Sequence, residues 1–209
     1  MTNGQQMSLF SGLGPRHLNL PDATIWYQAG FIAPFEARGY FERLQAHVAW
    51  RSEHLVAYGK QMPIPRLTAW YGDPGAFFTY SRIHNSPLDW TDDLTKLRCA
   101  VEQATQHRFN GVLLNLYRDG TDSIAWHSDN EREFGEQPVI ASLTFGATRK
   151  FRLRHKSRED LEVVELPLED GSLLVMAGET QRHWEHEIRK SKTVTGPRIN
   201  LTFRLVLTR

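Results

Sequence analysis

The chain has 209 residues, of which 40% are hydrophobic and 23% are charged, and its formal net charge is +1 at pH 7. This composition excludes a disordered or fibrous chain and supplies enough apolar residues for one well-filled core. Because the net charge is close to zero, any basic surface that binds nucleic acid must be local.

Cys99 is the single cysteine, which excludes an internal disulfide framework and fits a reducing compartment. It lies in an apolar helical pattern, so we expect a small core residue rather than a nucleophile. The N-terminal residues lack a secretory signal pattern, and no segment approaches the ~20 apolar residues of a membrane span. We therefore expect a cytoplasmic protein without membrane contact, and nothing in the sequence implies a protein partner or argues against a monomer.

The first third of the chain predicts an arm, a helix and a loop-rich region. Residues 1–21 are polar and rich in Gly, which favours a loosely held arm. Residues 34–50 predict a helix with a weak position at Gly39. Its apolar face would hold Phe35, Tyr40, Leu44 and Val48.

Residues 51–90 are dense in aromatic residues, Pro and Gly, and the turn signals GDPG and NSP predict hairpins and loops. An ordinary explanation of the aromatic rings is a small hydrophobic cluster beneath loops. A second helix follows, in which Thr91 suits the N-cap and acidic residues suit the first turn. Its buried face would hold Leu94, Leu97 and Val101.

From residue 110 the chain predicts short strands separated by Gly- and Asp-rich turns. The predicted strands are GVLLNLY, VIASLTF, RKFRLRH, LEVVELPL, SLLVMA and RINLTFRLV. Helices followed by about six to eight strands predict one α+β domain over residues 1–209, with a jelly-roll core over residues 110–209.

The last predicted strand has two different faces. Apolar residues alternate with Arg198, Asn200, Thr202 and Arg204. Arginine suits bidentate binding of carboxylates, so two arginines on one face predict an anion site. The alternative is an edge strand whose arginines lie in solvent or pair with acidic residues.

Three residues predict a metal site. His127 and Asp129 would point to the same side of an extended segment, and a third ligand would come from RHWEHEI as His183 or His186. Two imidazoles and one carboxylate form the facial triad that holds Fe(II) with open positions. Such iron commonly takes electrons from a 2-oxo acid, and 2-oxoglutarate carries two carboxylates for the arginine face. Two other histidines, His107 and His155, are expected to be surface residues.

The strand GVLLNLY adds polar groups near this site. Asn115 and Tyr117 share a face and could bind the same carboxylate, or they could be core polar groups bonded to backbone.

These motifs together resemble the AlkB family of Fe(II)/2-oxoglutarate-dependent dioxygenases, in the branch that repairs alkylated nucleic acids. The resemblance rests on residues 115–133, 142–156, 168–188 and 197–204, and it extends from about Arg66 to the C-terminus. It implies a double-stranded β-helix fold, which is a jelly roll, with Fe(II), 2-oxoglutarate and O₂ as cofactor and cosubstrates.

The resemblance also implies roles for individual residues. His186 becomes the third metal ligand, because the family's final histidine lies twelve residues before the first arginine of RxNxTxR. The residues implied to bind 2-oxoglutarate are Asn115, Tyr117, Arg198, Asn200, Thr202 and Arg204. For Asn200 two roles stay open, namely orientation of Arg198 and satisfaction of backbone groups.

Residues 51–90 would form the nucleotide-recognition lid. Phe78 and Tyr80 would frame the damaged base, Tyr58 would fill the gap left by a flipped base, and Glu131 would favour a cationic base. The full set of implied substrate contacts is Tyr58, Gly59, Lys60, Arg66, Phe78, Thr79, Tyr80, Asn130 and Glu131. Arg152 and Arg154, in the basic segment 149–158, would contact phosphates or belong to a solvated sheet face.

The activity implied is oxidative demethylation of 1-methyladenine and 3-methylcytosine in DNA, with release of formaldehyde, succinate and CO₂. The alternatives are a demethylase or hydroxylase of RNA or tRNA, an enzyme for etheno adducts, and a non-catalytic jelly roll that binds metal or nucleic acid. The preferred lesion, the strand preference and the biological pathway stay open at this level.

Overall fold

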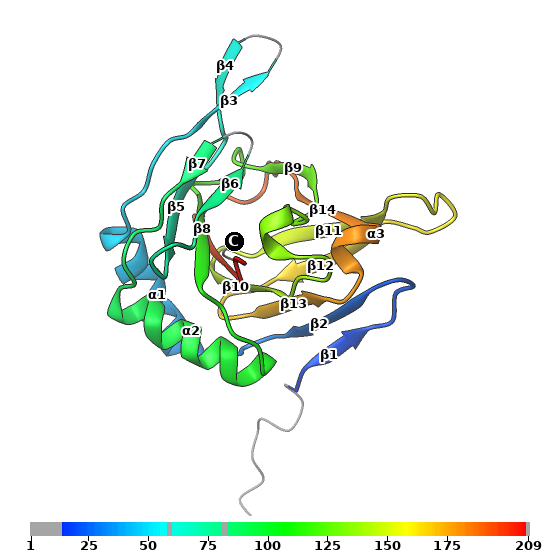
Figure 1. Ribbon diagram of the computed structural model, residues 1–209, viewed down its shortest axis with the longest axis horizontal. Helices are drawn as coiled ribbons and strands as arrows, with labels where there is room; N and C mark the ends of the chain where they lie inside the picture. The colour runs from blue at the N-terminus through cyan, green and yellow to red at the C-terminus, as the bar shows by residue number, and fades with distance from the viewer. Residues whose placement is uncertain (1–13, 58–59, 81–82, 208–209) are drawn as a thin grey trace, which may run out of the picture.

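The structure of the protein, a computed structural model, describes residues 14–57, 60–80 and 83–207 (Figure 1). Two antiparallel β-sheets face each other, and two long helices cover one of them (Figure 1). This arrangement confirms the predicted α+β fold with a jelly-roll core.

The larger sheet has seven strands and the smaller sheet has four. In spatial order, the larger sheet contains β1 (Arg16–Leu18), β2 (Thr24–Gln28), β13 (Leu173–Ala177), β10 (Ile140–Gly146), β15 (Arg198–Arg204), β8 (Gly111–Tyr117) and β5 (Leu67–Gly72). The smaller sheet contains β12 (Val164–Leu168), β11 (Arg149–His155), β14 (Trp184–Ile188) and β9 (Ile124–His127).

Alternation along the central strands divides their side chains between two environments. In β8 and β15, one face buries apolar residues such as Leu114 and Leu201 in a core shared with the helices. The other face carries Asn115 and Arg198 into the space between the sheets. A second core, which includes Ile140, fills the rest of that space.

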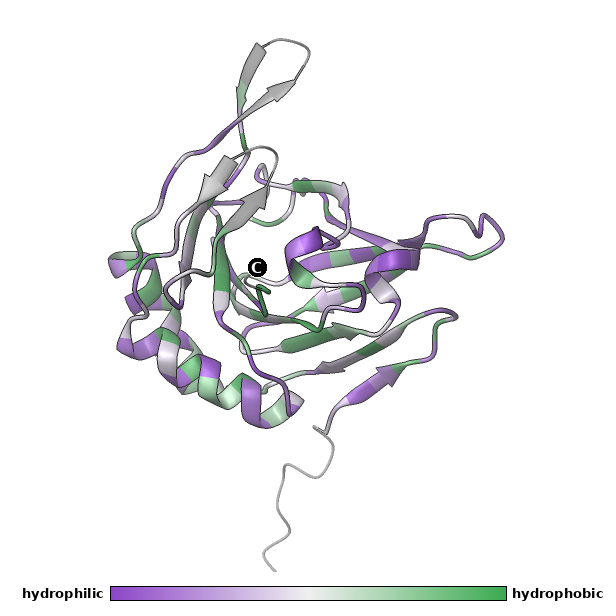
Figure 2. Cartoon of the chain, viewed as in Figure 1, coloured by the Kyte–Doolittle hydropathy of each residue, from purple (hydrophilic) through white to green (hydrophobic). Residues whose placement is uncertain are grey.

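Helices α1 (Pro34–His47) and α2 (Asp92–Thr105) pack on the outer face of the larger sheet (Figure 1). Figure 2 shows green and purple residues alternating around both helices, as expected for amphipathic helices at a surface. The Thr91 hydroxyl accepts a hydrogen bond from the backbone N–H of Leu94 at 3.3 Å, so the predicted N-cap is confirmed. The predicted buried face of Leu94, Leu97 and Val101 is confirmed as well.

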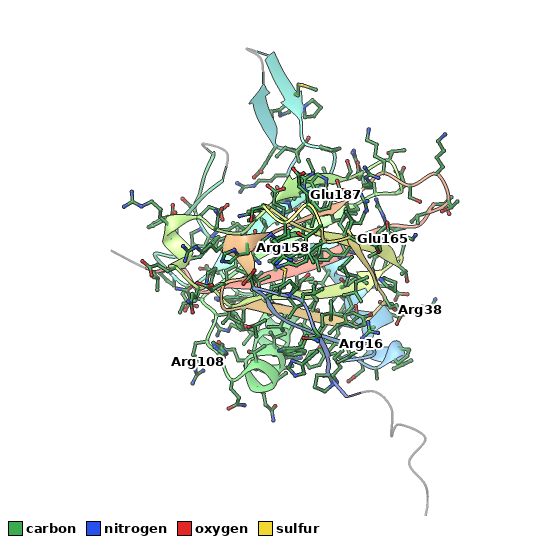
Figure 3. The ribbon with its side chains drawn as sticks, turned by 90° about the vertical axis from the view of Figure 1, so that its right-hand side faces the viewer. Arg16, Arg38, Arg108, Arg158, Glu165 and Glu187 are labelled. Atoms are coloured by element: carbon green, nitrogen blue, oxygen red, sulfur yellow. The ribbon has the colours of Figure 1, made fainter. Side chains whose placement is uncertain are left out.

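Two hairpins lie outside the main sheets. They are β3 (His54–Ala57) with β4 (Lys60–Pro63), and β6 (Phe78–Tyr80) with β7 (Ile83–Asn85). The β3–β4 hairpin projects from the upper end of the molecule in both Figure 1 and Figure 3. Two short helical segments, η1 (Arg132–Phe134) and α3 (Thr180–His183), lie in connections next to β9 and β14.

The larger sheet extends beyond the predicted core range of residues 110–209. Arg16–Leu18, within the predicted arm, forms β1 and pairs with β2. Leu67–Gly72, within the predicted loop-rich region, forms β5 and pairs with β8. Nearly every residue of β5 is buried, so it lacks the alternation that identifies a half-exposed strand.

Three expectations about single residues are wrong. Cys99 is exposed, because it lies two positions after the buried Leu97 and so faces away from the sheet. Phe35 is 91% exposed, because it lies two positions before the buried Ala37 and so faces away from the sheet. His155 is buried, because alternation along β11 turns it to the same side as Phe151 and Leu153.

His107 is exposed at the end of α2, as predicted. Among the described residues, no helix is both long and apolar enough to cross a membrane.

Candidate metal and cosubstrate site

A cavity opens between the two sheets, and polar side chains from both sheets meet in it. The larger sheet contributes residues of β8, β10, β13 and β15, and the smaller sheet contributes residues of β9, β11 and β14. The lining residues that carry polar groups are Arg66, Asn115, Tyr117, His127, Asp129, Ser142, His186, Arg198, Asn200, Thr202 and Arg204.

Two histidines face each other across neighbouring strands. His127 in β9 is the register partner of His186 in β14, and their ring centroids are 4.2 Å apart. The Nδ1 atom of His127 lies 2.9 Å from the carbonyl oxygen of Ala125. Nδ1 must donate this hydrogen bond, so the neutral ring keeps a lone pair on Nε2 for a metal ion.

Asp129 completes a cluster of three metal-binding side chains. Its Oδ2 atom lies 3.8 Å from Nε2 of His186, and Arg204 donates from Nη2 to its Oδ1 at 2.6 Å. The ligand atoms of His127, Asp129 and His186 all lie within 4.8 Å of one another. Two imidazoles and one carboxylate at this separation fit a divalent transition metal such as Fe(II).

The electrostatics of this cluster favour the forms that bind metal. Burial and the neighbouring His127 lower the pKa of His186 to about 3, so its imidazole is neutral at pH 7. Burial alone would raise the pKa of Asp129, but Arg204 and the two histidines outweigh it and lower this pKa. Asp129 is therefore an anion at neutral pH.

Arg198 lies on the opposite wall of the cavity and fits an anionic ligand. It is 1% exposed, and among the described residues it has no carboxylate partner. Its Nη2 atom donates to Thr144 Oγ1 at 3.0 Å and to Asn200 Oδ1 at 2.7 Å, while its buried Nε has no hydrogen-bond partner in the described structure. Burial lowers its pKa to about 10, and an anion in the cavity would offset this burial.

Asn200 has a defined place in this wall. Its Oδ1 accepts from Arg198 and from Ser142 Oγ at 2.9 Å, and its Nδ2 donates to Thr202 Oγ1 at 2.8 Å. Of its two open roles, orientation of Arg198 is therefore the one that the geometry supports. Ser142 and Thr144 are not among the predicted site residues, although they are the two polar residues at alternate positions in VIASLTF.

Asn115 and Tyr117 also face the cavity, from β8. Asn115 Oδ1 accepts a hydrogen bond from Arg66 Nε at 2.8 Å, and Arg66 is itself buried. The guanidinium of Arg198 lies 5.2 Å from the ring centroid of Tyr117, and these residues are register partners. Both predicted polar groups of β8 are therefore in the cavity wall.

The predicted substrate positions are distributed over several elements. Asn130 is exposed, and Glu131 has a buried Oε2 atom without a hydrogen-bond partner among the described residues. Burial raises the pKa of Glu131 to about 7 despite the nearby Arg204. Of the remaining positions, Tyr58 and Gly59 lie outside the described residues, Lys60 begins β4, and Phe78, Thr79 and Tyr80 form β6.

Arg152 and Arg154 lie on the outer face of the smaller sheet, where acidic residues of neighbouring strands bind them. Arg154 pairs with Glu185 at 2.7 Å, and Arg152 pairs with Glu165 at 3.1 Å and with Glu187 at 2.5 Å. Figure 3 shows Glu187 and Glu165 on this side of the molecule. This face therefore carries acidic as well as basic side chains.

The basic segment 149–158 also includes one buried arginine. Arg149 is 2% exposed and donates to the backbone oxygens of Asp119, Asp122 and Arg189. It therefore holds two loops against the sheet and contributes no charge to the outer face.

His183 belongs to a second cluster, outside the cavity. Its ring stacks on that of His155 at 5.7 Å, and Asp22 Oδ2 lies 3.3 Å from Nε2 of His155. However, Nδ1 of His155 accepts backbone N–H bonds from Ser157 and Arg158, at 3.3 and 3.1 Å. A neutral ring must then carry its proton on Nε2, so His155 donates to Asp22 and has no lone pair for a metal.

Comparisons with known proteins agree with this geometry. Residues 24–204 match the family model of the 2OG-Fe(II) oxygenase superfamily. The chain is 43% identical over 185 residues to "Alpha-ketoglutarate-dependent dioxygenase alkB homolog 3" of Mus musculus, which covers 85% of this chain and 64% of that protein. It is 39% identical over 201 residues to "DNA oxidative demethylase ALKBH2" of Mus musculus, which covers 92% of this chain and 84% of that protein.

A solved structure shares the fold. "The structure of OsALKBH1" superposes with a TM-score of 0.64 at 16% identity, over 92% of this chain and 100% of that chain. The chain spans 64% of the length of the mouse alkB homolog 3. From the matched family model and the relatives, the chain belongs to the AlkB family of the 2OG-Fe(II) oxygenase superfamily.

Proposed function

We propose that this protein is an Fe(II)- and 2-oxoglutarate-dependent dioxygenase that removes methyl groups from N-alkylated bases in DNA. The observation that carries the proposal is one cavity with the His127, Asp129 and His186 cluster on one wall and the buried Arg198 on the other. The relative named "DNA oxidative demethylase ALKBH2" supports this activity and the choice of DNA.

His127, Asp129 and His186 would hold Fe(II). The two imidazoles offer neutral nitrogen ligands and Asp129 offers one negative charge, while Arg204 occupies the other carboxylate oxygen and fixes its orientation. When bound, Fe(II) with O₂ and 2-oxoglutarate supplies the oxidation of the N-methyl carbon to formaldehyde, with succinate and CO₂ as the other products.

The larger sheet would hold 2-oxoglutarate. Arg198 would form an ion pair with one carboxylate, and the bonds from its Nη2 to Asn200 and Thr144 fix the guanidinium for that purpose. The other residues proposed for this cosubstrate are Asn115, Tyr117, Thr202 and Arg204, all of which line the same cavity.

The alkylated base would enter beside Glu131. A base methylated at N1 of adenine or N3 of cytosine carries a positive charge, and a buried carboxylate near the metal cluster favours a cation. We also propose base contacts from Tyr58, Gly59, Lys60, Arg66, Phe78, Thr79, Tyr80 and Asn130. Arg152 and Arg154 stay proposed as weak phosphate contacts, because each already pairs with glutamates.

The deciding experiment measures formaldehyde and succinate together. Oligonucleotides with 1-methyladenine or 3-methylcytosine are supplied as single-stranded DNA, double-stranded DNA and RNA, with Fe(II) and 2-oxoglutarate. We expect equimolar products from DNA and none from His186→Ala. Faster turnover of RNA would move the proposal to an RNA demethylase, and absence of both products would remove the proposed activity.

A further inference from the structure

Gln181 is a buried side chain that reaches the metal cluster from outside the cavity. It lies in α3, is 1% exposed, and its Oε1 accepts a hydrogen bond from the backbone N–H of Asp129 at 2.8 Å. We propose that Gln181 is a positioning residue that fixes Asp129 relative to His186 for metal binding. This inference rests on the proposed function of the His127, Asp129 and His186 cluster.

The sheet alone leaves Asp129 weakly placed. The two halves of the cluster come from different segments, with Asp129 following β9 and His186 within β14. β9 is an edge strand of four residues that ends at His127, and its pairing with β14 contains a register shift between His186 and Ile188. Since Asp129 lies beyond the end of β9, backbone pairing does not fix its position.

Two side-chain bonds replace the missing backbone pairing. Gln181 binds the N–H of Asp129, and Ser128 Oγ donates to the carbonyl oxygen of Trp184 at 3.0 Å. Both bonds connect residues 128–129 to residues 181–184, which lead directly into His186. The separation between the carboxylate and the second imidazole therefore depends on this cross-link for the backbone of Asp129, while Arg204 holds the carboxylate itself.

The platform that carries Gln181 is itself held in place. Lys156 donates from Nζ to the carbonyl oxygen of Gln181 at 2.9 Å, and its backbone N–H donates to His183 at 2.8 Å. Trp184 is 1% exposed and donates from Nε1 to the carbonyl oxygen of Pro21 at 2.9 Å. Because these bonds hold the backbone around Gln181, its side chain can hold Asp129 in a fixed position.

The test measures Mn(II) binding to the metal-free protein by electron paramagnetic resonance, with and without 2-oxoglutarate. Gln181→Met keeps the length of the side chain but removes the acceptor. We expect the Mn(II) Kd to rise by about 10- to 100-fold, the usual effect of removing a group that orients a metal ligand. Arg182→Met is the matched control, because its exposed neighbour position in α3 lacks this bond, and its Kd should stay at the wild-type value.

Further variants separate positioning from general destabilisation. Gln181→Glu restores an accepting oxygen and should recover part of the Mn(II) affinity. At saturating Mn(II), the Gln181→Met protein should bind 2-oxoglutarate with a Kd within about twofold of the wild-type value, because the substitution leaves Arg198 unchanged. If Gln181→Met does not fold, Ser128→Ala carries the same test through the second bond.

A folded Gln181→Met protein with wild-type Mn(II) affinity overturns the inference. That result differs from failure of the proposed function, which would appear as Mn(II) binding by the wild type that His186→Ala leaves unchanged.

Discussion

Asp129 and Arg204 form a buried ion pair that joins the two walls of the cavity. Arg204 Nη2 lies 2.6 Å from Asp129 Oδ1, and both side chains are nearly inaccessible to solvent. The pair comes from the loop after β9 and from the end of β15, so it connects the proposed metal site with the proposed cosubstrate wall. Breaking a buried pair leaves one charge without compensation.

We predict that Arg204→Met lowers the free energy of unfolding of the metal-free protein by about 3–5 kcal/mol, because Asp129 becomes a lone buried anion. Urea denaturation measures this change. Adding Asp129→Asn should recover part of the loss, since the double variant has no buried charge at either position. A loss below about 1 kcal/mol in the single variant would contradict a strong coupling between the two residues.

Replacing Arg198 should have the opposite effect on the free energy of unfolding from replacing Arg204. Because it is buried without a carboxylate partner in the described structure, Arg198→Met should keep or raise the free energy of unfolding of the ligand-free protein. The same variant should raise the KM for 2-oxoglutarate by about 10-fold or more, as expected from a lost charged hydrogen bond of about 1.5–3 kcal/mol. Steady-state succinate formation and urea denaturation check the two halves.

Arg38→Met, on the exposed surface of α1, is the control for Arg198→Met. It should change neither the free energy of unfolding nor the KM for 2-oxoglutarate. An Arg198→Met protein with wild-type KM for 2-oxoglutarate would exclude Arg198 from the cosubstrate site.

The two histidines of RHWEHEI should differ in their effect on metal binding. His186→Ala should abolish Mn(II) binding at the cavity, whereas His183→Ala should leave it unchanged, because His183 faces His155 and Glu179 outside the cavity. Titration of metal-free protein with Mn(II) compares the variants. Equal losses in both would show that the outer cluster also contributes to metal binding.

The raised pKa of Glu131 predicts a pH dependence of stability. Its folded-state pKa is about 7, above the ordinary value, so the folded protein binds an extra proton between about pH 4.5 and 7 and loses that stability as pH rises. The Glu131→Gln variant has no proton to release at this position, so this loss of stability is absent from it. Relative to wild type, the metal-free variant should gain about 2–3 kcal/mol in the free energy of unfolding between pH 5 and pH 8.

Urea denaturation at these two pH values checks the prediction for Glu131. Glu136→Gln is a control on an exposed carboxylate a few residues away. A difference between wild type and Glu131→Gln that does not change with pH would show that this carboxyl titrates in its ordinary range.

Salt dependence tests the phosphate contacts of the smaller sheet. Binding of undamaged DNA is measured over a range of salt concentrations. If Arg154 contacts a phosphate, Arg154→Gln should reduce the slope of log K for DNA binding against log salt concentration by about 0.7–0.9. The matched control is Arg108→Gln, because Figure 3 shows Arg108 at the lower end of the molecule, far from the β3–β4 hairpin. An unchanged slope for Arg154→Gln would assign this residue to its ion pair with Glu185 alone.

Much of the fold and the site could be predicted from local patterns. Alternation in β8 and β15 determined which side chains face the cavity, because successive residues of a strand point to opposite sides. Thr91 and the spacing of Leu94, Leu97 and Val101 determined α2 in the same way. Spacing from Arg198 selected His186 within the family pattern, and its place opposite His127 agrees with that choice.

Only the tertiary structure decided what depends on contacts between distant segments. It buried Arg149 against the backbone oxygens of two loops, and it placed glutamates of β12 and β14 against the arginines of β11. It also revealed Gln181, because nothing in ETQRH indicates that this amide reaches Asp129 across the fold. A residue's own pattern states which way it points, whereas its partner depends on how the two sheets close on each other.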